Sequence, residues 1–275
     1  MTMLDTIKES ILAKLLLMVI IAWVIMAIIF GFTDLQISQA VRDSESAWGN
    51  FGDVYGEGPG YGLIAIGIVI LIASGTTELK KQKIPAYVVI IIAMILFILG
   101  FAFADEEGLN EDLIIYGGFI GFPVLIFTIL FFNKDWSEYK NIAIVIVLLA
   151  IIVPLLYVQI LKLIWGRVRP RDVFAGEGVF TAWYIINGYT DNHSFPSGHT
   201  SMGFMLLPLL ITVREREWKD PAKLITWILV VGWALFVGAS RVIVEAHFAS
   251  DVLFSAGMAS VVTILLYNKF CKDRS

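Results

Sequence analysis

The chain has 275 residues, of which 58% are hydrophobic and 16% charged, and its mean hydropathy is +0.82. A water-soluble domain of this size could not cover so much apolar surface, so the composition predicts a membrane protein. The net charge of −4 argues against nucleic-acid binding, and a single cysteine, Cys271, excludes an intrachain disulfide and a thiolate zinc site.

Long apolar runs predict an all-α, polytopic transmembrane bundle of about eight spans. A helix needs roughly 20 mostly apolar residues to cross a bilayer, and the runs lack the alternation of barrel strands. In chain order, the expected spans are 11–31, 60–76, 86–104, 113–132, 142–164, 199–213, 223–239 and 251–268. The second span, at 60–76, is shorter than the roughly 20 residues that a crossing needs.

The connectors alternate between acidic and basic composition. Residues 32–59 and 105–112 are rich in Asp and Glu, whereas 80–83, 214–223 and the tail at 269–274 are rich in Lys and Arg. Positive residues favour the cytoplasm, so we expect both termini to be cytoplasmic, which eight spans satisfy. The 133–141 connector is nearly neutral and adds little.

One connector on the expected outer side breaks this rule. Arg167, Arg169 and Arg171 follow Lys162, which lies near the end of the fifth span. The side chains could snorkel to the membrane interface or form an anion site. Four cations within ten residues on the disfavoured side favour the anion site.

Two motifs contain groups that suit an oxyanion. The first is Lys162-x6-Arg169-Pro170; two helical turns would place both cations on one side, with Pro170 ending the helix. The second is Pro-Ser197-Gly198-His199, at the start of the sixth span. Its Ser-Gly pair could be an ordinary helix cap, or its free N–H groups could bind an anion with His199 at the rim.

A third motif reads Ser-Arg241-x5-His247-x3-Asp251. In a helix, the four-residue spacing would bring His247 and Asp251 into contact. An aspartate beside an imidazole suits a nucleophilic or general-base histidine, although a buried ion pair between helices is the alternative. Two of the three histidines of the chain lie in these motifs and His193 lies just before the second, which favours chemistry.

In this order, the three motifs resemble the signature of the type 2 phosphatidic acid phosphatase superfamily, and every signature position matches. The resemblance covers about 142–268. It implies an N-terminal group of transmembrane helices at 1–141 and a catalytic core at 142–275. Many lipid phosphatases of this family have six spans, so either two helices are additional here or the short second span is misjudged.

The resemblance implies a membrane phosphatase that dephosphorylates a lipid phosphate or diphosphate through a phosphohistidine, at the non-cytoplasmic face. His247 would be the nucleophile, Asp251 would orient it, and His199 would protonate the leaving oxygen. Phosphate would be bound by Lys162, Arg169, Ser197, Gly198 and Arg241. No metal or other cofactor is expected, since fixed cations replace it. Arg167, Arg171 and His193 receive no role.

Phosphatidylglycerophosphate, phosphatidic acid and undecaprenyl diphosphate all fit this interpretation. A sugar-phosphate phosphatase of the glucose-6-phosphatase type is an alternative, because it too has extra spans. Vanadate-dependent haloperoxidases share the signature but are soluble and much longer. A non-enzymatic anion transporter would need charges through the bilayer depth, whereas the middle of the fifth span, 144–156, has none.

Overall fold

The computed structural model describes residues 3–102 and 109–272. Side chains are described from residue 11 in the first helix and from residue 111 in the helix that begins at Leu109. Every regular element in these ranges is helical. Seven described segments are long and apolar enough to cross a membrane: Ile11–Val41, Ala47–Ala73, Lys81–Ala102, Glu111–Leu130, Trp136–Ala175, Pro221–Ile243 and Ala249–Phe270. A shorter apolar segment, Gly198–Thr212, makes the eighth. The predicted all-α bundle of about eight spans is confirmed.

Five spans consist mainly of one helix each: α1 (Met3–Val41), α4 (Ile84–Ala102), α5 (Leu109–Leu130), α11 (Pro221–Ile243) and α12 (Ala249–Phe270). The second span joins α2 (Ala47–Tyr55) to α3 (Gly58–Ala73), and the sixth joins α9 (Gly198–Gly203) to α10 (Leu209–Thr212). In the fifth, α6 (Lys140–Ala150) and α7 (Val158–Trp165) flank a π-helical stretch, Ile151–Tyr157. Pro154 lies in that stretch, where the regular ladder is interrupted because proline has no N–H to donate.

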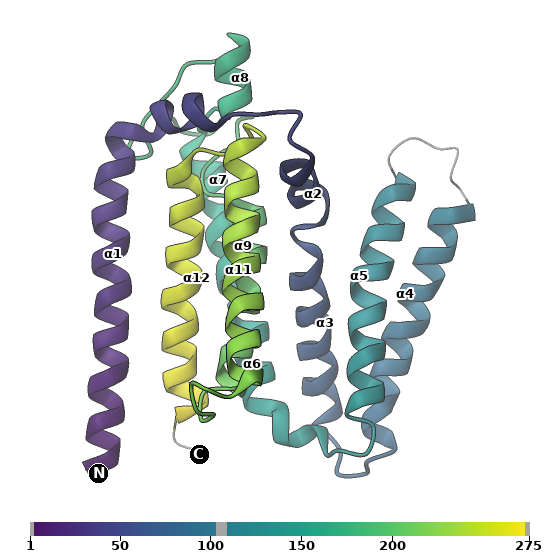
Figure 1. Ribbon diagram of the computed structural model, residues 1–275. Coiled ribbons are helices and arrows are strands. Elements are labelled where there is room, and N and C mark those ends of the chain that lie inside the picture. The colour runs from purple at the N-terminus through teal and green to yellow at the C-terminus, as the bar shows by residue number, and fades with distance from the viewer. Residues whose placement is uncertain (1–2, 103–108, 273–275) are drawn as a thin grey trace.

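The core of the bundle lies where α3, α6, α9 and α12 meet. Its buried residues include Val145, Leu149, Met205 and Ala259. Helix α1 packs along α12, and α4 and α5 pack against each other at one side (Figure 1). The helices that carry the three motifs are therefore held by the N-terminal helices as well as by one another.

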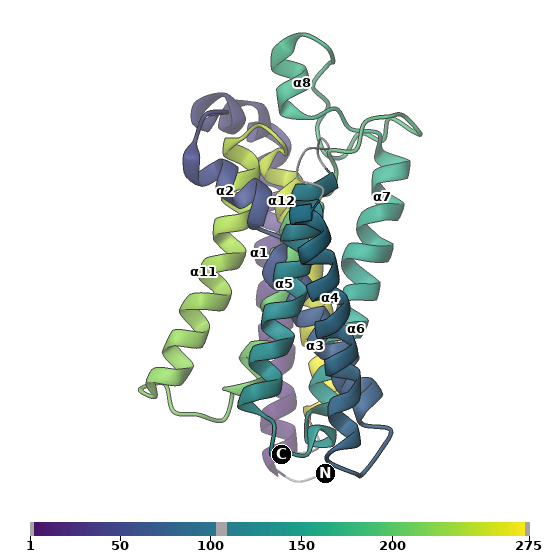
Figure 2. The same ribbon diagram turned by 90° about the vertical axis from the view of Figure 1, so that its right-hand side faces the viewer.

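The described ends of α1 and α12 nearest the chain termini lie at the same end of the bundle, and the short helix α8 (Pro170–Ala175) lies at the other (Figure 1). Turning the molecule shows α11 and α7 on opposite sides (Figure 2). The connectors with the three motifs all lie at the end marked by α8. This arrangement agrees with the alternation expected from the sequence.

Helix α1 differs from expectation. Helix α1 continues ten residues beyond the expected end at 31, and Asp34 and Ser38 in this extension are buried. The Asp34 carboxylate can be buried here because it has polar partners inside the protein. The acidic residues Asp105, Glu106 and Glu107, and the basic Arg274, lie outside the described residues.

Candidate active site

The first motif lies at the end of the fifth span and does not form one continuous helix. Helix α7 ends at Trp165 because Gly166 adopts a left-handed conformation with φ of +54°, which favours glycine. Arg169 is the extended N-cap of α8, and Pro170 is the first residue of that helix. The expected two-turn helix ending at Pro170 is therefore wrong. Lys162 and Arg169 nevertheless lie near enough for their charges to interact.

The second motif forms the predicted helix start. Ser197 is the N-cap of α9, and its Oγ accepts hydrogen bonds from Thr200 N at 3.3 Å and Thr200 Oγ1 at 2.9 Å. A Cβ added to Gly198 would lie 3.5 Å from Lys162 Nζ, so the ammonium group lies over the start of the helix. The first two motifs thus place a cation beside the N–H groups of a helix terminus, an arrangement that suits an anion.

The third motif forms the turn between α11 and α12. The backbone N–H groups of Ala246 and His247 both donate to Arg241 O at 3.0 Å, and Glu245 has a φ of +58°. Helix α12 begins only at Ala249, so His247 and Asp251 do not share the helix on which their contact was conditional in the sequence. The pair still meets, with His247 Nδ1 3.5 Å from Asp251 Oδ2. The sharp turn, rather than helical spacing, brings them together.

Burial controls the charge of His247. Its side chain is 3% exposed, and burial lowers the pKa of His247 to about 4, against the opposing effect of Asp251. The ring is therefore neutral at neutral pH and keeps a nitrogen lone pair. The charges of Arg241 and Lys162 also act on this ring. A neutral imidazole beside two cations is suited to attack an anionic phosphate.

Asp251 is fixed by three hydrogen-bond donors. Its Oδ1 accepts from Arg167 Nη1 at 2.5 Å, and its Oδ2 accepts from Ser194 Oγ at 2.6 Å and Phe248 N at 2.9 Å. These bonds orient the carboxylate so that Oδ2 also faces the His247 ring. The carboxylate is fully buried, so its position depends on these partners.

Arg167, to which the sequence assigned no role, is fully buried. Besides Asp251, it binds Asp34 of α1, with Nη2 2.9 Å from Asp34 Oδ2. Asp34 also accepts from Ser250 N at 2.9 Å and from the Ser250 hydroxyl. A buried chain of charges therefore runs from α1 through Arg167 to the carboxylate beside His247.

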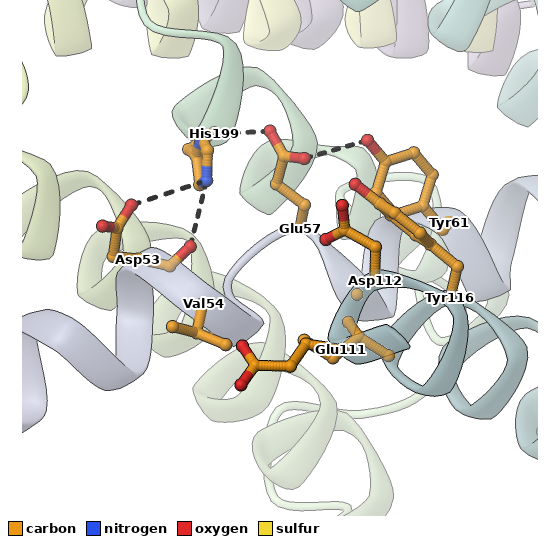
Figure 3. Close-up of a pocket in the computed structure, with 10 residues that line it drawn as sticks. Asp53, Val54, Glu57, Tyr61, Glu111, Asp112, Tyr116 and His199 are labelled. Carbon is orange, nitrogen blue, oxygen red and sulfur yellow. Dashed lines mark hydrogen bonds and ion pairs between the residues drawn. The ribbon is translucent and has the colours of Figure 1, made fainter. Parts of the chain in front are cut away.

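His199 lies between two carboxylates of the second span (Figure 3). Its Nδ1 is 3.1 Å from Glu57 Oε1, and its Nε2 is 3.0 Å from Asp53 O. Arg241 forms an ion pair with the Asp53 carboxylate. Next to His199 is a cavity of about 280 Å³, lined by polar groups that include Tyr61 and Tyr116.

The structure thus brings the predicted site residues to one end of the bundle. His199 and His247 are close enough to interact electrostatically, as are Arg169 and Arg241. Arg171 is half exposed, 3.9 Å from Asp172, and His193 has a buried Nδ1 without a hydrogen-bond partner in the described structure. Neither has a contact that assigns it a role.

Asp34, Asp53 and Glu57 were not predicted as site residues from the sequence, where they form part of an acidic connector. The four-residue spacing of Asp53 and Glu57 was a usable signal, because in a helix it would place both on one side, although in the structure Asp53 lies in α2 and Glu57 directly before α3. No three His, Cys, Asp or Glu side chains in the described part of the chain form a group that could hold a metal ion.

Comparison with known proteins identifies the family. The PAP2 superfamily model matches residues 143–274. Lipid A 4'-phosphatase of Francisella tularensis subsp. novicida is 31% identical over 175 residues, in a match that covers 55% of this chain and 76% of that protein. The chain belongs to the PAP2 superfamily. The family model's match, at residues 143–274, does not include the N-terminal helices that supply Asp34, Asp53 and Glu57.

Two further PAP2 relatives are lipid A 1-phosphatases from Rhizobium. The protein of Rhizobium etli is 34% identical over 119 residues, 41% of this chain and 45% of the relative. That of Rhizobium johnstonii is 35% identical over 106 residues, 38% of this chain and 37% of the relative. No solved structure matches the chain.

Proposed function

We propose that the protein is a membrane lipid phosphatase that hydrolyses a phosphate monoester on the sugar headgroup of lipid A and releases inorganic phosphate. The observation that carries the proposal is the meeting of a neutral His247, a second histidine and three cations at one end of a membrane bundle. The names of the relatives support lipid A as the substrate. The polar cavity next to His199 supports it too, since a glucosamine headgroup carries hydroxyl and amide groups that polar side chains can bind.

In the first step, His247 Nε2 attacks phosphorus. The new P–N bond forms as the P–O bond to the sugar breaks, and His199 gives its proton to the leaving sugar oxygen. Lys162, Arg169 and Arg241 balance the charge on the three phosphoryl oxygens, with the N–H groups at Ser197 and Gly198 as further donors. Electrostatic stabilisation of this kind is the main requirement of phosphoryl transfer.

In the second step, water attacks the phosphohistidine. His199, now neutral, takes a proton from the water as the P–N bond breaks, and inorganic phosphate leaves. His247 is restored with its lone pair, and His199 is restored as an acid. Asp251 holds His247 in one tautomer and stabilises the positive charge that develops on the ring. No step needs a metal ion or other cofactor.

We place the active site on the non-cytoplasmic side of the membrane and both termini in the cytoplasm. The basic connectors at 80–83 and 214–223 support this orientation, because they lie at the end of the bundle away from the site. Residues 142–275 would form the catalytic core and residues 1–141 a helical addition. That addition contributes Asp34, Asp53 and Glu57 to the surroundings of the site.

The test is phosphate release by the purified protein in detergent with EDTA present. The substrates are lipid A, phosphatidylglycerophosphate, phosphatidic acid, undecaprenyl diphosphate and glucose 6-phosphate. We expect lipid A to be hydrolysed at least about tenfold faster than the others, a difference of about 1.4 kcal/mol in transition-state binding. Faster hydrolysis of another lipid would reject lipid A as the substrate. If none of the five compounds is hydrolysed, the proposed phosphatase activity is rejected.

A further inference from the structure

The second span supplies a carboxylate that contacts His199 directly. Glu57 is the residue before α3, and its side chain makes no capping hydrogen bond to that helix. Its Oε1 instead lies 3.1 Å from His199 Nδ1, within range of a charge-assisted hydrogen bond (Figure 3). We propose that Glu57 is the positioning residue for His199, making a second histidine–carboxylate pair beside that of His247 and Asp251.

Glu57 is itself held in place from the other side. Tyr61, one turn further along α3, donates its hydroxyl to Glu57 Oε2 at 2.9 Å. The Tyr61 ring packs edge-to-face on Tyr116 of α5, with centroids 5.3 Å apart. One carboxylate oxygen is therefore fixed by tyrosine while the other faces the imidazole, so that the histidine meets a rigid acceptor.

The two nitrogens of His199 face two different acceptors. Nδ1 faces Glu57 Oε1, and Nε2 faces the Asp53 carbonyl at 3.0 Å. Only a doubly protonated ring can donate at both positions, and this is the form that a general acid must have. Burial, Arg241 and His247 oppose the positive charge of this ring, and the carboxylates of Glu57 and Asp53 act against them.

This geometry gives each nitrogen a separate task in the proposed reaction, on which the inference rests. The Nδ1–H group stays hydrogen-bonded to Glu57 throughout the reaction, and this bond fixes the plane of the imidazole ring. Nε2–H exchanges its contact with the Asp53 carbonyl for one with the leaving oxygen and then transfers its proton. The same nitrogen later accepts a proton from water, with Glu57 stabilising the imidazolium that forms.

The effect of Glu57 should depend on the leaving group. An alkyl or sugar alkoxide is a poor leaving group that needs a proton from His199, whereas p-nitrophenolate leaves without one. A residue that only supports the fold would affect both substrates equally. The kcat/KM values report phosphoenzyme formation alone, so slower hydrolysis of the intermediate does not enter the comparison.

The experiment compares Glu57→Gln with the wild type on lipid A and on p-nitrophenyl phosphate. The expected result is a fall in kcat/KM of at least about tenfold on lipid A and a change within about threefold on p-nitrophenyl phosphate. Glu45→Gln is the matched control, because Glu45 is exposed, precedes α2 and has no contact with His199. It should match the wild type on both substrates.

A double variant separates positioning from support of the fold. Adding Glu57→Gln to His199→Asn should cause no further fall in kcat/KM on lipid A, because Glu57 acts through His199. Equal falls on both substrates, an unchanged Glu57→Gln enzyme, or additive effects in the double variant would overturn the inference. If the wild type hydrolyses neither substrate, the proposed function itself fails, which is a distinguishable result.

Discussion

Replacing Arg167 by lysine keeps the positive charge but removes the planar fork that holds the carboxylate beside His247. The guanidinium donates to four acceptors within the protein at 2.5 to 2.9 Å: Thr181 O, Ser250 Oγ, Asp251 Oδ1 and Asp34 Oδ2. A lysine ammonium is a point donor on a flexible stem and cannot reach groups on opposite sides of this fork. We expect at least one carboxylate to lose its charged partner.

The magnitude follows from the bonds lost. A hydrogen bond to a charged group contributes about 1.5 to 3 kcal/mol, so the loss of one or two would destabilise the fold by about 2 to 5 kcal/mol. Misplacing Asp251 by about 1 Å would also turn His247 away from phosphorus and lower kcat by up to about 100-fold. Arg167→Lys should therefore fall in both thermal midpoint and kcat.

The assay is thermal unfolding in detergent together with kcat on lipid A. Arg171→Lys is the control, since Arg171 lies four residues further along the chain, its side chain is half exposed, and its guanidinium is 3.9 Å from the Asp172 carboxylate. It should resemble the wild type in both measurements. An Arg167→Lys protein with wild-type midpoint and kcat would refute the proposed role of the buried charge chain.

Two further predictions concern packing and protonation. Gly257→Ala should destabilise the protein by about 1 to 3 kcal/mol in thermal unfolding, because the new Cβ would lie within 2.8 Å of three ring atoms of Trp23 where α1 meets α12. Gly232→Ala, with nothing within 4 Å, should be at least as stable as the wild type, and the reverse order would contradict this packing. Because burial lowers the pKa of His247 to about 4, its ring should remain neutral on acidification until about pH 4 in ¹⁵N-histidine NMR, with His247→Asn assigning the signal. Titration near 6.5, the ordinary histidine value, would contradict the buried environment.

The eight spans could be predicted because a membrane span is encoded locally. Each needs only a continuous apolar run, and connector charges then fix which connectors share a side. The same alternation of sides predicted that the connectors with the three motifs would lie at one end of the bundle. Helix ends were harder: seven residues between Lys162 and Arg169 look like two helical turns, yet the left-handed Gly166 ends the helix between them.

The missed residues belong to long-range contacts that no local pattern encodes. Asp34 meets Arg167 and Glu57 meets His199 across more than 130 positions of sequence. Their composition alone suggests a solvated acidic connector, and only the packing of α1 and α2 against the motif helices shows that they are partners of cations and of a histidine. Buried charges of this kind are paired because an unpaired one would be too unstable.

The central claim is that His247 becomes covalently phosphorylated, and rapid-quench analysis tests it most directly. In His199→Asn, p-nitrophenyl phosphate should still form the phosphoenzyme, whereas hydrolysis of that intermediate should be slow because its general base is missing. We predict a burst of about one p-nitrophenolate per protein, with alkali-stable phosphate on the peptide that contains His247 and none when His247→Ala is added. Phosphate on another residue, or steady turnover without any protein-bound phosphate, would contradict the account.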